Sequence, residues 1–119
     1  LRQVQLTDHF WLPKIRQIQQ VTIPFALQKC EENGRFENFL TAEKVIKGGT
    51  GKVLGKMPFD DTDPYKIIEG ASLTLVSSPD KELDALLDKY IAIIVRGQEP
   101  DGYLTTWRTI NIPFTRTIF

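Results

Sequence analysis

The stretch "PDKELDALLDKYIAIIVRG", residues 79–97, decides the fold. Its apolar residues recur every three or four positions, at Leu83, Leu86, Leu87, Tyr90, Ile91 and Ile94. This spacing places one apolar stripe along one side of a helix. Ser78 is expected to cap the helix and Pro79 to take its first position. Asp80 and Glu82 follow in the first turn, where the helix dipole favours negative charge. The stretch therefore predicts an amphipathic helix that packs against other elements.

Helical spacing also runs through the chain upstream of this stretch. Residues 13–33 predict one kinked helix or two short ones, because Pro24 removes a backbone donor in mid-run. Gly34 is expected to end this run, since glycine adopts the left-handed conformation at little cost. A second helix is expected over residues 35–47. A third is expected to begin at about Asp63 and to continue to residue 76.

The end of the chain carries different signals. Residues 99–102, "EPDG", predict a turn, because proline presets one backbone angle and glycine accepts a strained one. Residues 103–119 are β-prone and predict irregular structure. The chain is therefore expected to be all-α, built of helical hairpins with short extended N- and C-terminal segments, as a single domain over residues 1–119.

Composition excludes several classes of function. Among 119 residues, 15 are Lys or Arg and 15 are Asp or Glu, so the formal net charge is zero. This balance argues against nucleic-acid binding, which needs a basic patch. No apolar run approaches the roughly 18 residues of a membrane helix, so no membrane partner is expected. The first residues lack a signal peptide's pattern and an initiator methionine, which leaves a removed leader open, and either a bacterial cytoplasm or periplasm.

Metal and thiol chemistry have few candidate residues. Cys30 is the only cysteine and His9 the only histidine, so neither a cysteine cluster nor a histidine pair for zinc exists in the chain. No metal site or cofactor is therefore expected within it. Cys30 itself is expected to pack as a small apolar residue in a helix. The loop "GGTGKVLGK", residues 48–56, fails the phosphate-loop pattern, so nucleotide binding is not predicted.

Three aspartates stand together in "GKMPFDDTDPYKIIEGAS", residues 55–72. Asp63 before Pro64 favours a helix start with an N-cap carboxylate. Asp60 and Asp61 would add favourable charge at that end of the helix. The pattern fails a calcium loop, and close neighbours rarely straddle a sugar as paired catalytic acids. Capping is the leading interpretation, while substrate contact and metal or acid–base chemistry stay open. Asp61 and Asp63 are kept as candidate substrate-binding residues.

Aromatic pairs offer a second kind of candidate site. Phe10 with Trp11, and Tyr103 with Trp107, are expected to fill a small helical core, as large aromatic residues usually do. The alternative is that they line a sugar cleft, because sugars stack on aromatic faces. On that alternative Trp107 is the third candidate substrate-binding residue.

Four stretches in a fixed order carry a family resemblance. They are "LTDHFWLPKIRQIQQVTIPFALQKCEENGRFENF", "PFDDTDPYKIIEGASLTL", "DKELDALLDKYIAIIV" and "QEPDGYLTTWRTI". From Leu6 to about Ile110 the chain resembles the N-terminal segment of the β-L-arabinofuranosidase family, glycoside hydrolase family 127. The resemblance implies part of an α/α toroid of six helical hairpins.

The same resemblance implies the chemistry of the whole family. Its members are retaining glycosidases with a cysteine nucleophile beside zinc and a glutamate acid/base. Those motifs lie further along the family's chain, and Cys30 does not match the nucleophile motif. The resemblance therefore assigns no catalytic residue and no metal ligand here, and zinc belongs to the full-length family.

Together these observations predict an N-terminal fragment of a glycoside hydrolase acting on L-arabinofuranosides or related plant glycans, inactive alone. The alternatives are a stand-alone helical self-association module or a carbohydrate-binding module. The ending "NIPFTRTIF", residues 111–119, departs from the family, which suggests a truncated gene, a frameshift or a trimmed chain. An incomplete toroid would expose apolar helix faces. We therefore expect a plant-derived glycan as partner and a homo-oligomer formed through the fourth helix or the tail.

Overall fold

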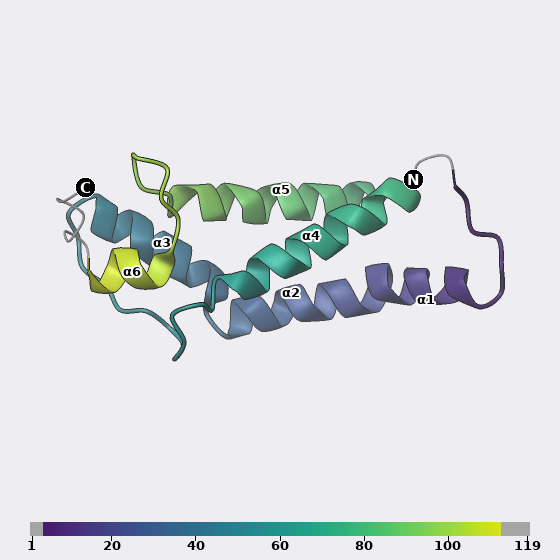
Figure 1. Cartoon of the computed structure of the whole chain (residues 1–119), viewed down its shortest axis with the longest axis horizontal. Coiled ribbons are helices and arrows are strands. Elements are labelled where there is room, and N and C mark those ends of the chain that lie inside the picture. The colour runs from purple at the N-terminus through teal and green to yellow at the C-terminus, as the bar shows by residue number, and fades with distance from the viewer. Residues whose placement is uncertain (1–3, 113–119) are drawn as a thin grey trace.

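The computed structural model describes residues 4–112, and every regular element in that range is helical. The elements follow one another as α1 (Trp11–Gln17), η1 (a π-helical turn, Ile18–Thr22), α2 (Ile23–Glu32), α3 (Arg35–Ile46), α4 (Thr62–Ser77), α5 (Lys81–Arg96) and α6 (Thr106–Asn111). Figure 1 shows α1 and α2 end to end along one edge, α5 along the opposite edge, and α4 crossing obliquely between them. The predicted all-α fold of helical hairpins is confirmed.

The first helical run begins earlier than predicted. Trp11 is the first residue of α1, and Pro13 is the third. Asp8 sets this start, because its carboxylate accepts hydrogen bonds from the backbone N–H groups of Phe10, Trp11 and Leu12. These bonds, that of Trp11 foremost, lower the pKa of the Asp8 carboxyl group. A short acidic side chain, not the proline, therefore fixes where the helix begins.

The interruption predicted around Pro24 takes the form of the π-helical turn η1, which separates α1 from α2. Pro24 is the second residue of α2, directly after η1. Proline has no N–H for the carbonyl four residues back, and its ring collides with that carbonyl. A wider turn at this point relieves the collision. The buried Gln19 of η1 donates a hydrogen bond to the carbonyl oxygen of Ser78 at 2.7 Å, which ties the turn to the link between α4 and α5.

Of two helix boundaries predicted from the sequence, the one at Gly34 is confirmed and the cap at Ser78 is wrong. Gly34, with a φ of 71°, separates α2 from α3 as expected. Ser78 does not cap α5, because it is the residue that ends α4. The N-cap of α5 is Asp80, whose Oδ1 accepts hydrogen bonds from the N–H groups of Glu82 and Leu83, both at 3.0 Å. The cap therefore lies two residues later than predicted.

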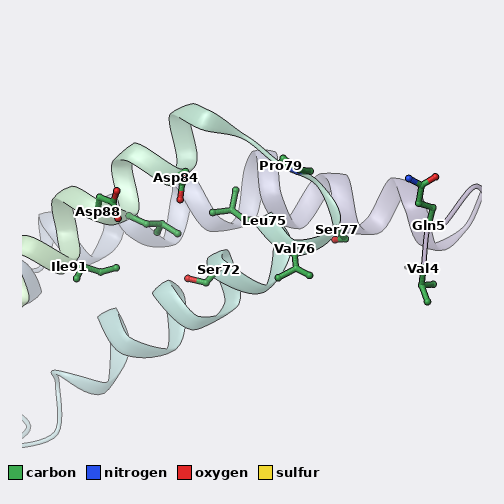
Figure 2. Close-up of a pocket in the computed structure, with 11 residues that line it drawn as sticks. Val4, Gln5, Ser72, Leu75, Val76, Ser77, Pro79, Asp84, Asp88 and Ile91 are labelled. Carbon is green, nitrogen blue, oxygen red and sulfur yellow. The ribbon is translucent and has the colours of Figure 1, made fainter. Parts of the chain in front are cut away.

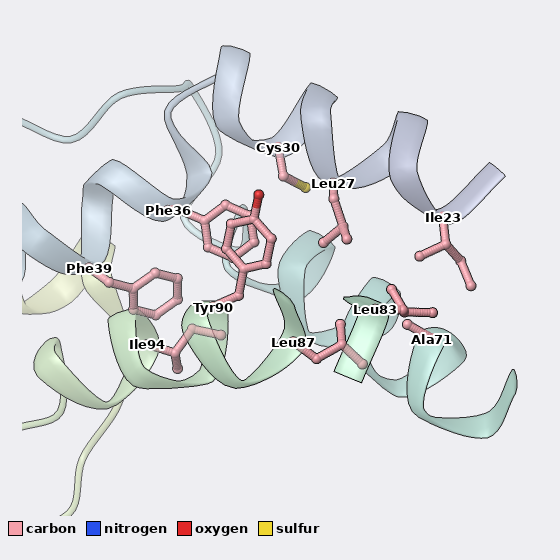
Figure 3. Close-up of a cluster of buried hydrophobic side chains, with 10 residues drawn as sticks. All are labelled: Ile23, Leu27, Cys30, Phe36, Phe39, Ala71, Leu83, Leu87, Tyr90 and Ile94. Carbon is pink, nitrogen blue, oxygen red and sulfur yellow. The ribbon is translucent and has the colours of Figure 1, made fainter. Parts of the chain in front are cut away.

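The core lies between α5 and the helices opposite it. The residues that form it are Ile23, Leu27, Cys30, Phe36, Phe39, Ala71, Leu83, Leu87, Tyr90 and Ile94 (Figure 3). The ring of Tyr90 stacks on that of Phe36, with 4.0 Å between ring centroids. The apolar stripe of α5 is therefore confirmed, except that Ile91 is 42 % exposed. Cys30 is buried among apolar neighbours, as predicted.

Two expectations about aromatic and terminal residues were wrong. Phe10 and Trp11 are not core residues, since they are 60 % and 59 % exposed. Within the tail expected to be irregular, Thr106–Asn111 forms the helix α6, which packs against α3 through Ile110. Residues 113–119 lie outside the described part of the chain. None of the helices between residues 4 and 112 has the length and apolar character needed to cross a bilayer.

Candidate functional site

The three aspartates lie at the start of α4. Asp63 is the second residue of that helix, so the prediction that it is the N-cap is wrong. Asp61 takes the position before the first helical residue, and its side chain makes no capping bond to α4. The carboxylates instead reach partners far away in the chain, on the loops and helices at the same end of the bundle.

Asp61 binds the first residue of α6. Its Oδ2 accepts a hydrogen bond from the backbone N–H of Thr106 at 2.7 Å, and its Oδ1 accepts one from the Thr106 hydroxyl at 2.6 Å. Asp61 is 6 % exposed and Thr106 is 1 % exposed, so water does not compete for these bonds. Hydrogen bonds to a charged acceptor are among the strong ones. Asp61 therefore caps a helix that begins 45 residues later.

Arg35 holds the other two aspartates. Its Nη1 lies 3.1 Å from Oδ2 of Asp60, and its Nε donates to Oδ2 of Asp63, also at 3.1 Å. The Arg35 and Asp60 side chains are 19 % and 10 % exposed, whereas that of Asp63 is 50 % exposed. The planar guanidinium suits two carboxylates at fixed positions. The first residue of α3 is therefore fastened to the start of α4.

The end of the glycine-rich loop is held by the side chain of a helix residue. The side chain of Asn38, 1 % exposed, donates to the carbonyl of Leu54 and accepts from its N–H, both at 2.8 Å. Gly55 follows with a φ of 105°, and a Cβ there would lie 2.2 Å from Oδ2 of Asp60. A side chain at this position would displace that carboxylate. Gly55 is therefore explained by the tight path of the loop.

Trp107 and Tyr65 complete this end of the bundle. Trp107 follows the capped Thr106 and is partly buried. The Tyr65 hydroxyl is buried and has no hydrogen-bond partner among residues 4–112. Burial first, and the negative charge of Asp61 second, raise the pKa of Tyr65 well above its ordinary value. The phenol therefore stays protonated.

The three residues chosen from the sequence thus have different surroundings. Asp61 and Trp107 are linked through Thr106, while Asp63 is the most exposed of the carboxylates. Substrate contact by these residues stays a prediction. The sequence analysis missed Arg35 and Asn38, because their partners lie on distant segments. The one sequence feature that could have pointed to Arg35 is its position directly after Gly34, the glycine that ends a helix.

Thiol and metal chemistry are not supported by the described residues. Cys30 is 5 % exposed, and burial, reinforced by the charge of Asp63, raises the pKa of its thiol. A nucleophilic cysteine needs the opposite shift. Residues 4–112 bring together no group of three His, Cys, Asp or Glu side chains that could hold a metal ion. The zinc centre expected of the full-length family therefore does not fit these residues.

Two solved structures resemble this helical arrangement closely. One is a GH127 β-arabinofuranosidase, with a TM-score of 0.79 and 45 % identity over 92 % of this chain. The other is a GH127 β-L-arabinofuranosidase from Geobacillus stearothermophilus T6, with a TM-score of 0.83 and 31 % identity over 96 % of this chain. The fold is thus part of an α/α toroid of the glycoside hydrolase type.

The sequence comparison narrows this class to one family. The family model described as "Beta-L-arabinofuranosidase, GH127 catalytic domain" matches residues 3–117, and the chain belongs to this family. It is also 43 % identical over 63 residues, or 53 % of its length, to a non-reducing end β-L-arabinofuranosidase from Bifidobacterium longum subsp. longum. The chain spans 10 % of that relative and 17 % and 18 % of the two solved chains.

Proposed function

We propose that this chain is a structural sector of a glycoside hydrolase that acts on L-arabinofuranosides or related plant glycans, and that the chain alone is inactive. The observation that carries this proposal is the family match over residues 3–117, combined with the burial of the Cys30 thiol, which raises its pKa. The role of this sector is structural, because its side chains hold helices and loops in place. The reacting groups lie outside it.

The side chains that hold these elements in place lie where the start of α4 meets the start of α6. The Asp61 carboxylate fixes the start of α6, the helix that carries Trp107. Arg35 fixes the loop before α4 through Asp60 and Asp63. Of the three candidate substrate-binding residues, Asp63 and Trp107 are accessible enough to touch a sugar. Asp61 is a positioning residue for Trp107, because both of its oxygens are already engaged.

A chimaera tests this function. The matched segment of the 45 % identical GH127 β-arabinofuranosidase is replaced by residues 4–112 of this chain. We expect a cooperatively folded protein that still hydrolyses an aryl L-arabinofuranoside. The matched control is the same chimaera with Asp61→Asn, which should lose stability and turnover together. A chimaera that fails to fold, or that folds without turnover, contradicts the proposal.

One observation favours carbohydrate binding as a second candidate. Phe10 and Trp11 form an exposed edge-to-face pair, with ring centroids 4.9 Å apart and planes at 87°. Exposed aromatic faces can stack on sugar rings. This pair lies at the start of α1, at the end of the bundle away from α6 (Figure 1). Titration of an L-arabinose oligosaccharide should change the fluorescence of Trp11 and not that of Trp107 on this alternative, which Trp11→Phe and Trp107→Phe variants separate.

A further inference from the structure

Two residues, Asn33 and Gly34, form the joint between α2 and α3. Asn33 is exposed and Gly34 is buried. Gly34 has a φ of 71°, and a Cβ there would lie 2.5 Å from Cδ1 and 2.8 Å from Cβ of Leu54. Both the backbone conformation and the available space therefore require glycine at position 34. The order asparagine then glycine has a chemical consequence.

An asparagine followed by glycine is the pair most prone to lose its side-chain amide in water. The glycine nitrogen, once deprotonated, bonds to the side-chain carbonyl carbon of the asparagine, because glycine has no side chain to hinder the approach. The bond from that carbon to the amide nitrogen breaks, ammonia leaves, and a five-membered succinimide remains. Water then opens the ring at either carbonyl and gives aspartate or isoaspartate. The other two asparagines, Asn38 and Asn111, precede a bulky residue that hinders this attack.

The folded joint holds the two reacting atoms apart. The N–H of Gly34 donates to the carbonyl oxygen of Glu31 at 3.0 Å, and Nδ2 of Asn33 donates to that of Lys29 at 2.8 Å. At a ψ of 6°, the Gly34 nitrogen eclipses the Asn33 nitrogen instead of approaching the Asn33 side chain. Ring closure therefore requires both hydrogen bonds to break and ψ to rotate, which is a local opening of the last turn of α2.

Leu54 covers the joint from the glycine-rich loop. The three atoms nearest to a Cβ built on Gly34 all belong to the Leu54 side chain. The side chain of Asn38 holds the Leu54 backbone there through two hydrogen bonds of 2.8 Å. Leu54 is 46 % exposed, so it covers the joint on one side and faces solvent on the other. Opening of the joint therefore breaks the contact between Gly34 and Leu54.

We propose that Asn33 is a site of spontaneous deamidation, which the joint blocks in the folded chain and permits when the end of α2 opens. The product does not rebuild the joint. Aspartate has no amide group to donate to Lys29, and its charge is unfavourable at the C-terminal end of a helix. Isoaspartate adds a methylene to the main chain and moves Gly34 relative to Leu54. The proposal does not depend on glycosidase activity.

Peptide mass spectrometry of the full chain measures the reaction. The folded chain and the same chain in urea are incubated at mildly alkaline pH, and trypsin then releases residues 30–35, between Lys29 and Arg35. Conversion of Asn33 changes the mass of this peptide, and chromatography separates its aspartate and isoaspartate forms. We expect conversion in urea and at least about tenfold slower conversion in the folded chain. Asn33→Gln should abolish the mass change.

Leu54→Ala and Ile91→Ala separate local from global opening. Leu54→Ala uncovers the joint and should speed conversion of the folded chain by about threefold or more. Ile91 is a similarly exposed aliphatic residue, at 42 %, in the groove between α4 and α5 (Figure 2). Ile91→Ala should leave the rate of the parent chain unchanged. Circular dichroism checks that both variants fold, and hydrogen exchange of the Gly34 amide measures opening of the joint in the parent chain itself.

Several results would overturn the proposal. They are equal conversion in the folded chain and in urea, no conversion in urea, equal acceleration by Leu54→Ala and Ile91→Ala, and a Gly34 amide that exchanges only on global unfolding. The last result decides the matter if Leu54→Ala does not fold. Asn33→Asp mimics one product and should lower the melting temperature. An Asn33→Asp variant as stable as the parent chain would show that the product does rebuild the joint.

Discussion

Asp61 and Thr106 lie 45 residues apart in the chain, and two hydrogen bonds of 2.7 and 2.6 Å join them in the buried end of the bundle. This link sets the start of α6 against the start of α4. In the sequence Asp61 looks like part of an acidic cluster, but in the structure its carboxylate has a structural partner, Thr106. The consequences for stability can be measured directly.

Replacing Asp61 by Asn should lower the free energy of unfolding by about 1–3 kcal/mol. The amide keeps one acceptor oxygen, while its NH₂ group faces a donor from Thr106. Asp63→Asn is the matched control, and its half-exposed ion pair should be worth no more than about 1 kcal/mol. Urea unfolding followed by circular dichroism measures both. Equal losses of unfolding free energy for the two variants would show that the buried Asp61–Thr106 bonds contribute no more than the half-exposed Asp63–Arg35 pair.

Added metal separates this structural role from metal binding. With its oxygens engaged by Thr106, Asp61 has little capacity for a cation, and Asp63 is paired with Arg35. Calcium or zinc should therefore leave the melting temperature of the chain unchanged. A rise that disappears in Asp61→Asn or Asp63→Asn would mean that the aspartates bind metal.

Gly55 and Gly70 should respond in opposite directions to substitution by Ala. Gly55 has a φ of 105°, and a Cβ there would lie 2.2 Å from an Asp60 oxygen and 2.8 Å from Arg35 Nη1. Gly55→Ala should therefore destabilise the protein by more than about 1 kcal/mol. Gly70 lies inside α4 with open space around it, so Gly70→Ala should stabilise by roughly 0.5–1 kcal/mol. The melting temperatures of the two variants are compared with that of the parent chain. A Gly55→Ala variant as stable as the parent would show that the loop has room for a side chain.

The position of the α5 cap has its own test. Asp80→Ala removes the acceptor of two backbone hydrogen bonds and should cost about 1 kcal/mol. Ser78→Ala should cost little, because its carbonyl, not its hydroxyl, receives the bond from Gln19. Chemical denaturation of both variants compares them. A larger loss for Ser78→Ala would restore the cap originally predicted from the sequence.

The Cys30 thiol should be slow to react in the folded protein. Burial raises its pKa above the ordinary value of 9.0, so both the thiolate population and solvent access are reduced. An aromatic disulfide reagent at mildly alkaline pH should react at least about tenfold more slowly with folded protein than with protein in urea. The folded state also holds this proton more tightly. Its contribution to stability is therefore full below pH 9 and is lost as the pH rises above that value.

The sequence predicted helices well where local spacing alone determines them. The α5 stripe and the stop at Gly34 are local signals, and both were correct. The interruption at Pro24 has a local steric cause, and the π-helical turn η1 lies directly before it. Ile91 was assigned to the core because it fits the stripe, but no neighbouring helix in residues 4–112 covers it.

The candidate site was harder to predict, since its contacts join distant segments. Local rules placed Asp63 as a helix cap, whereas its carboxylate binds Arg35, 28 residues away. Asp61 and Thr106 have no sequence pattern that relates them. The helix α6 was missed because its residues are β-prone, and the Asp61 cap and the contact of Ile110 with α3 outweigh that propensity.

The most direct test of the account is the activity of the purified chain on an aryl L-arabinofuranoside, with the Geobacillus stearothermophilus T6 relative as positive control. The account predicts turnover by the relative and none by this chain, at any pH where both are folded. The Cys30→Ala variant should behave as the parent chain does. Turnover by the parent chain that disappears in Cys30→Ala would contradict the account, because it would make Cys30 the nucleophile of a self-sufficient enzyme.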